Sequence, residues 1–154
     1  MRQANVLQFP LSATNLPNFT LSDYAGKNVI LYFYPKDSTP GCTTESQQFR
    51  DLLSEFTRAN CVIFGVSRDS LKSHEKFKQQ QELNFELIAD QEEALCQHFE
   101  VIKDKMMYGK PARGIERSTF LFDTKGNLQK EWRAVKADGH AEEVLDFVQK
   151  EITR

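Results

Sequence analysis

The chain has 154 residues, enough for one domain with its own hydrophobic core, and we expect residues 1–154 to form a single domain. Its composition is that of a globular protein: 40% of the residues are hydrophobic, 27% are charged, and the net charge is only −2. These values argue against a disordered, collagen-like or coiled-coil chain, and against binding to nucleic acid or to an anionic membrane.

Three cysteines, Cys42, Cys61 and Cys96, stand far apart in the sequence. No two of them form a CxxC pair and their spacing does not suit a structural zinc site, so we expect neither a metal nor a cofactor. An odd number of scattered cysteines is typical of a reducing compartment. Since the sequence also has no long apolar stretch, we expect a cytoplasmic protein without a signal peptide or a membrane-spanning segment.

The first part of the chain predicts a buried strand followed by a helix. Residues 1–17 are expected to form an irregular or short-stranded lead-in. Val29 to Tyr34 is a continuous β-branched and aromatic run, which is typical of a strand buried on both faces. A segment with Pro and Gly interrupts the run, and a helix is expected from Cys42 to about residue 59, with apolar residues at helical spacing between Phe49 and Phe56.

The middle of the chain continues this alternation. Cys61 to Val66 predicts a second buried strand, and a helix is expected over 70–81 with Asp69 or Ser70 as its N-cap. A third, short strand is expected over 85–88 and a helix over 91–99. Residues 103–117 are rich in Lys, Gly, Pro and Met and are predicted to form a loop.

The last part of the chain predicts a β-hairpin, over 119–122 and 128–135, and then a closing amphipathic helix that contains Ala141 and Val148. This order of elements favours an α/β fold with a mixed central sheet and helices on both faces, and a thioredoxin-like arrangement fits it. Neither GxGxxG nor GxxxxGK[ST] follows the first buried strand, so nucleotide-binding folds are not supported.

The strongest local signal surrounds Cys42, where a buried strand ends and a helix begins. In open α/β sheets, functional groups gather beyond the carboxyl ends of the strands. A thiol in the first turn of a helix faces unpaired backbone N–H groups and the positive end of the helix dipole, and both favour the thiolate. Thr39 lies three residues earlier and could aim its hydroxyl at the sulfur. The alternative is a buried structural cysteine after an ordinary loop.

This segment resembles the peroxidatic motif of the peroxiredoxins, and most closely that of the bacterioferritin comigratory protein, or peroxiredoxin Q, subfamily. Segments 16–21, 65–67, 87–90, 114–121 and 139–145 resemble the same subfamily, so the resemblance covers nearly the whole chain. It implies a thioredoxin-like fold and a thiol peroxidase that reduces hydrogen peroxide and organic hydroperoxides. The residues that carry the motif are Tyr34, Pro35, Thr39, Pro40, Gly41, Cys42 and Thr43.

The resemblance also implies roles for individual residues. Cys42 would be the peroxidatic cysteine, whose thiolate attacks one peroxide oxygen and becomes a sulfenic acid. Thr39 would orient the peroxide, and Pro35 would shield the pocket. Arg117 would favour the thiolate and stabilise charge as the O–O bond breaks. Glu45 would orient Arg117, although a favourable acidic residue near a helix N-terminus is an equal alternative.

The sulfenic acid must be reduced by a second thiol, and here the sequence departs from its relatives. Many of them carry this cysteine where the chain has Gln47, and others carry it in the next helix, where the chain has Lys78. Cys61 begins a predicted strand and is expected to be a packing residue. Cys96 could be the resolving cysteine only if its helix unfolds locally, and core packing is its alternative. We therefore expect a one-cysteine mechanism in which glutathione, a glutaredoxin or thioredoxin supplies the reducing thiol.

Two other functions compete with the peroxidase. A thioredoxin-like disulfide reductase needs two adjacent thiols, which the chain lacks. A non-catalytic redox sensor or binding module would use Cys42 only as a switch, and the presence of Pro35, Thr39 and Arg117 argues against it. We expect a monomer, because relatives in this subfamily are often monomers and the sequence has no heptad pattern.

Overall fold

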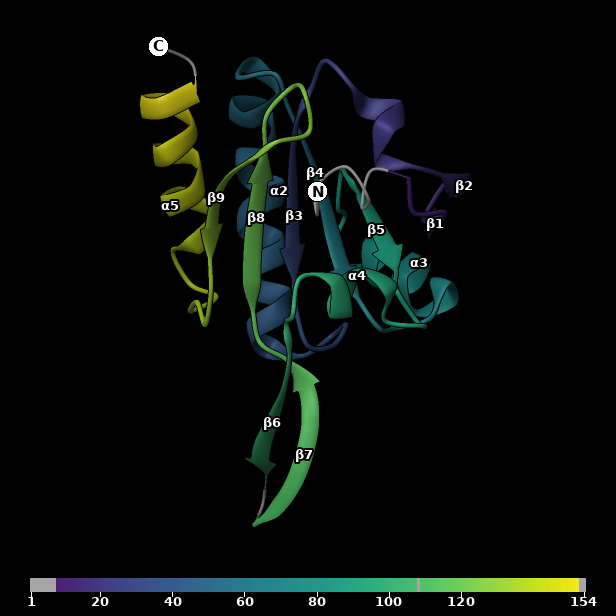
Figure 1. Cartoon of the computed structure of the whole chain (residues 1–154). Helices are drawn as coiled ribbons and strands as arrows, with labels where there is room; N and C mark the ends of the chain where they lie inside the picture. Colours follow the sequence, from purple (N-terminus) through teal and green to yellow (C-terminus); the bar gives the residue numbers. More distant parts are fainter. Residues whose placement is uncertain (1–7, 108, 153–154) are drawn as a thin grey trace.

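A seven-stranded mixed sheet forms the centre of the computed structural model, which describes residues 8–107 and 109–152 (Figure 1). The strand order is β2-β1-β5-β4-β3-β8-β9. In chain order the strands of this sheet are β1 (Leu11–Ala13), β2 (Leu16–Phe19), β3 (Asn28–Phe33), β4 (Cys61–Ser67), β5 (Glu86–Ala89), β8 (Ser118–Phe122) and β9 (Leu128–Trp132).

The centre of the sheet is parallel and its edges are antiparallel. Strand β3 pairs in parallel with β4, and β4 with β5, whereas β8 runs antiparallel to β3. Because side chains alternate along a strand, Ile30 and Tyr32 of β3 enter one hydrophobic cluster and Leu31 and Phe33 enter the other. All four side chains are fully buried. The predicted strand buried on both faces is therefore confirmed.

Helices cover both faces of the sheet, as expected from the sequence. Residues of α2 (Pro40–Arg58), α3 (Leu71–Gln80) and α5 (His140–Phe147) belong to the cluster on one face. Residues of α4 (Ala94–His98) and of a short 3-10 helix, η1 (Leu21–Tyr24), belong to the cluster on the other. A π-helical turn, η2 (Val148–Ile152), extends α5. Among the described residues, no helix is long and apolar enough to span a membrane.

Several boundaries differ from those predicted. Helix α2 begins at Pro40, two residues before Cys42, because proline at the first helical position lacks only an N–H that would have no helical partner. Ser70, and not Asp69, caps α3, since its hydroxyl accepts the N–H of Ser73. The helix expected over 91–99 is shorter, because Glu93 is in the left-handed region at φ 64° and the helix begins after it.

The prediction of a loop over 103–117 was wrong. Most of this segment forms a two-stranded antiparallel hairpin of β6 (Ile102–Met107) and β7 (Lys110–Ile115), which projects away from the main sheet (Figure 1). Its strands carry many charged residues and little of the polar–apolar alternation that marks a half-buried strand. Pro111 is tolerated in β7 because a two-stranded hairpin consists of edge strands.

Candidate active site

Cys42 is the third residue of α2 and lies just beyond the carboxyl end of β3, where it is fully buried. Thr39 is the N-cap residue of this helix, but its side chain makes no capping hydrogen bond. Instead, its hydroxyl donates to the Lys36 carbonyl over 2.8 Å. The N–H groups of Gly41 and Cys42 in the first turn, which have no intrahelical acceptor, therefore remain open to another partner.

Arg117 joins Cys42 to Glu45. It lies immediately before β8, and its Nη2 donates to the Cys42 Sγ over 3.5 Å. Its Nη1 donates to Glu45 Oε1 over 2.7 Å. Glu45 is one helical turn beyond Cys42 and fully buried. The structure thus brings together the three charged or ionisable residues that the sequence analysis selected, although 72 residues separate Glu45 from Arg117 in the chain.

Burial dominates the electrostatics of the ion pair. It raises the pKa of Glu45 from 4.5 to about 7, and the charge and hydrogen bond of Arg117 only partly oppose it. Burial would lower the pKa of Arg117, but Glu45 and Cys42 outweigh it and the pKa is raised overall. Arg117 therefore keeps its positive charge beside the sulfur at neutral pH. Within the described part of the chain, Glu45 Oε2 has no hydrogen-bond partner.

Gly41 makes room for the guanidinium. A Cβ atom at this position would lie 3.0 Å from Arg117 Nη2, closer than ordinary van der Waals contact. The half-buried Pro35 stands in the same connection between β3 and α2, where its ring fixes φ. From its place three residues before Cys42, Thr39 could have aimed its hydroxyl at the sulfur, but in the structure the hydroxyl donates to the Lys36 carbonyl.

The other two thiols lie away from Cys42. Cys61 opposes Asn28 at the amino end of β3, whereas Cys42 follows the carboxyl end of that strand. Cys96 belongs to the hydrophobic cluster on the opposite face of the sheet. Burial raises the pKa of Cys61 to about 12, and burial together with Asp90 raises the pKa of Cys96 far above its ordinary value. All three cysteines are free.

The two positions at which relatives carry a resolving cysteine hold polar residues with partners of their own. Gln47 Nε2 donates to Gln81 Oε1 over 2.8 Å, and the Lys78 ammonium lies 2.8 Å from Glu86 Oε1. Both contacts help to hold α3, which ends at Gln80, against its neighbours.

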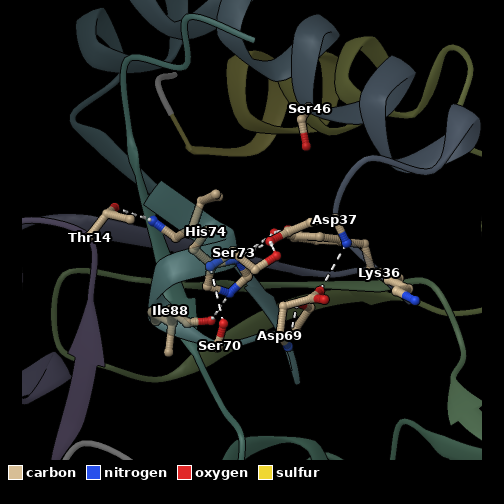
Figure 2. A network of polar contacts seen from close by, with 12 residues as sticks. Thr14, Lys36, Asp37, Ser46, Asp69, Ser70, Ser73, His74 and Ile88 are labelled. Carbon is tan, nitrogen blue, oxygen red and sulfur yellow. Dashed lines mark hydrogen bonds and ion pairs between the residues drawn. The ribbon is translucent and has the colours of Figure 1, made fainter. Parts of the chain in front are cut away.

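A polar cluster of Asp37, Asp69 and His74 includes a residue of the connection that precedes α2, and the sequence pattern did not reveal it (Figure 2). Asp37 and His74 are buried and Asp69 is partly exposed. Three of its side-chain atoms, one from each residue, lie within 4.8 Å of one another, so the cluster has the composition of a metal site. All three side chains are already hydrogen-bonded within the chain, however. The signal available in the sequence was the placement of Asp37 and Asp69 just after two parallel strands.

The chain resembles known proteins over most of its length. Residues 3–131 match the model of the AhpC/TSA family. The chain is 52% identical to peroxiredoxin Bcp of Xanthomonas campestris pv. campestris over 142 residues, which cover 92% of the chain and 89% of that protein. It is 54% identical to peroxiredoxin Bcp of Bacillus subtilis over 125 residues, or 81% of the chain and 80% of that protein.

A solved structure shows the same fold. The structure of the Xanthomonas campestris bacterioferritin comigratory protein, studied for its alkyl peroxide reduction activity, superposes with a TM-score of 0.91 at 49% identity. The match covers 97% of the chain and 95% of that protein. The thioredoxin-like fold expected from the sequence is therefore confirmed.

Proposed function

The chain belongs to the AhpC/TSA family and is a thiol peroxidase of its Bcp peroxiredoxin group, and we propose that Cys42 is the residue that reacts with the hydroperoxide. One observation carries this assignment. Cys42 lies in the first turn of α2 with the partly buried guanidinium of Arg117 3.5 Å from its sulfur. Burial raises the pKa of Cys61 and of Cys96, and at Cys96 the charge of Arg68 opposes this only in part.

The first step transfers one oxygen to sulfur. The Cys42 thiolate attacks the terminal oxygen of the hydroperoxide, an S–O bond forms and the O–O bond breaks. The electron pair of the broken bond stays on the leaving oxygen, which takes up a proton and departs as water or alcohol. Arg117 and the open N–H groups at the start of α2 stabilise the negative charge as it moves from sulfur to oxygen.

Three neighbouring residues support this step. Thr39 accepts a hydrogen bond from the hydroperoxide O–H, since its own proton is already donated to the Lys36 carbonyl. Glu45 holds the guanidinium of Arg117 in place through a charge-assisted hydrogen bond. Pro35 shields the sulfur from bulk water.

The second step uses an external thiol, so that the mechanism needs one cysteine of the chain. The thiol condenses with the Cys42 sulfenic acid to a mixed disulfide and water, and a second thiol then releases the Cys42 thiolate. The positions of Cys61 and Cys96, at the other end and on the other face of the sheet, support this proposal. Glutathione, a glutaredoxin or thioredoxin would supply the reducing thiol.

The proposal extends to the substrates, the cellular location and the oligomeric state. Because the Xanthomonas relative is described by its alkyl peroxide reduction activity, organic hydroperoxides are proposed as substrates beside hydrogen peroxide. Three free cysteines suit a reducing compartment, which supports a cytoplasmic location. The proposed working unit is a monomer.

Replacing Cys42 with serine tests the assignment. Cys42→Ser should abolish peroxide consumption in the presence of a small thiol, since a serine hydroxyl is not ionised at neutral pH. Cys61→Ser is the matched control, because it also replaces a buried thiol of the same hydrophobic cluster and should keep most of the activity. Turnover retained by Cys42→Ser would contradict the proposal, and insulin reduction by the wild type would favour a disulfide reductase instead.

A further inference from the structure

The connection between β3 and α2, residues 34–39, is held in place by hydrogen bonds of Asp37 (Figure 2). The buried carboxylate of Asp37 accepts hydrogen bonds from the Tyr34 hydroxyl over 2.7 Å and from the Ser73 hydroxyl over 2.8 Å. It also lies 2.8 Å from His74 Nδ1. The opposite ring nitrogen of His74 lies 2.9 Å from the Ile88 carbonyl of β5, so the imidazole is held at both ends.

A second carboxylate, that of Asp69, fixes one peptide group of this connection. The Asp37 N–H donates to Asp69 Oδ2 over 2.9 Å. The carbonyl on the same peptide group is that of Lys36, which accepts the Thr39 hydroxyl over 2.8 Å. Because a peptide group is planar, the direction of its N–H sets the direction of its C=O. Asp69 therefore determines where the Thr39 hydroxyl finds its acceptor.

The position of the Thr39 proton decides what this residue can offer a substrate. A threonine hydroxyl has one proton and two lone pairs. With the proton donated to the Lys36 carbonyl, both lone pairs remain to accept a hydrogen bond from a hydroperoxide O–H. If the peptide group turned, the hydroxyl would be free to rotate and to donate elsewhere. The fixed peptide group thus keeps Thr39 as an acceptor.

The backbone of this connection needs such external support. Ser38 has φ +66°, in the left-handed region that is unfavourable for a residue with a Cβ. Asp69 itself is held by Ser67, whose hydroxyl donates to Oδ2 over 2.5 Å, at the carboxyl end of β4. These hydrogen bonds therefore connect the end of a central strand to Thr39, which occupies the N-cap position of the Cys42 helix.

We propose that Asp69, supported by the Asp37–His74 pair, is a positioning residue of the peroxide site, which holds the Lys36–Asp37 peptide group so that Thr39 presents a hydrogen-bond acceptor to the hydroperoxide. Asp69 touches neither Cys42 nor the substrate and acts only through Thr39. The inference rests on the proposed role of Thr39 in the reaction.

A double-mutant cycle between Asp69 and Thr39 tests whether Asp69 acts through Thr39. The measured quantity is the second-order rate constant for oxidation of Cys42 by hydrogen peroxide in a single turnover. Thr39→Val removes the hydroxyl and should slow the reaction roughly tenfold, the value of one hydrogen bond. Asp69→Ala should slow it about fivefold, and the double variant about tenfold, since Asp69 has nothing to position once the hydroxyl is gone.

Two further variants separate positioning from stability. Asp69→Asn keeps a carbonyl oxygen that can accept the Asp37 N–H and should restore the rate to within about twofold of the wild type. Asp90→Ala is the matched control, because Asp90 also follows a central strand and accepts two backbone N–H groups, those of Leu95 and Cys96. It should lower the melting temperature and leave the rate constant unchanged.

The outcomes distinguish the inference from the function on which it rests. A double variant slowed about fiftyfold, the product of the single effects, would mean that Asp69 acts independently of Thr39 and would overturn the inference alone. An unchanged rate in Asp69→Ala would overturn it as well. An unchanged rate in Thr39→Val would remove Thr39 from the reaction, and the inference with it. Failure of Cys42 to oxidise in the wild type would refute the proposed function itself.

Discussion

Replacing Glu45 with glutamine should stabilise the protein, and the stabilisation should grow as the pH rises. The quantity compared is the free energy of unfolding of the variant minus that of the wild type at the same pH. Burial raises the pKa of Glu45 from 4.5 to about 7, against the opposing charge of Arg117. Each pKa unit is worth 1.36 kcal/mol, so keeping this carboxylate ionised in the folded protein costs roughly 3 kcal/mol. Glutamine has nearly the same shape and no charge, and it avoids this cost.

The sign follows from proton binding. Between the two pKa values the folded wild type holds a proton on Glu45 that the unfolded chain has released. The free energy of unfolding of the wild type therefore falls as the pH rises through this window, and the full cost is present above about pH 7. The variant lacks this dependence. Its free energy of unfolding minus that of the wild type should grow by roughly 3 kcal/mol between about pH 4.5 and about pH 8.

Urea unfolding of the reduced proteins, followed by circular dichroism at several pH values, measures this difference. The contributions of titrating groups that do not interact with Glu45 are common to both proteins and cancel. Glu55→Gln, which removes an exposed carboxylate from the same helix, controls for the loss of a glutamate in general. A difference between Glu45→Gln and the wild type that stays constant across the window would refute the argument that burial dominates at this ion pair.

Two further substitutions test the surroundings of Cys42. Gly41→Ala places a methyl group 3.0 Å from Arg117 Nη2, so it should displace the guanidinium and slow Cys42 oxidation roughly tenfold while the protein stays folded. Stopped-flow kinetics with peroxide measures the rate, and circular dichroism checks the fold. An unchanged rate would mean that Arg117 needs no fixed position. Cys96→Ala should leave turnover with glutathione and with thioredoxin within about twofold of the wild type, because the one-cysteine mechanism does not use the Cys96 thiol. A sharp loss of turnover with thioredoxin alone would identify Cys96 as the resolving thiol.

The buried strands and the long helix could be predicted from the sequence, because their apolar residues form continuous runs or recur at helical spacing. The strand ending at Phe33 and the one from Cys61 are runs of apolar residues, and their central position follows from burial on both faces. Helix α2 shows helical periodicity over several turns. Cys42 stood out because its neighbours in the chain define its setting, and the family resemblance added Arg117, which is distant in sequence.

The rest depends on contacts that no local pattern carries. The hairpin of β6 and β7 projects from the sheet, so burial imposes little alternation on its sequence. Asp37 and His74 are 37 residues apart, and they pair because α3 packs against β5 and so lies near the connection that follows β3. The partner of the Thr39 hydroxyl could not be chosen from the sequence, since a backbone carbonyl and the sulfur were equally within reach of a short turn.

Mass spectrometry with peptide mapping, after one equivalent of hydrogen peroxide is added to the reduced protein, tests the central claim most directly. A reagent that traps sulfenic acids would be present during the reaction. We expect the trapped oxygen on Cys42 alone, with Cys61 and Cys96 still thiols. A disulfide between Cys42 and Cys96 would contradict the one-cysteine mechanism, and three unmodified thiols in the presence of unreacted peroxide would contradict the assignment of Cys42 as the reactive residue.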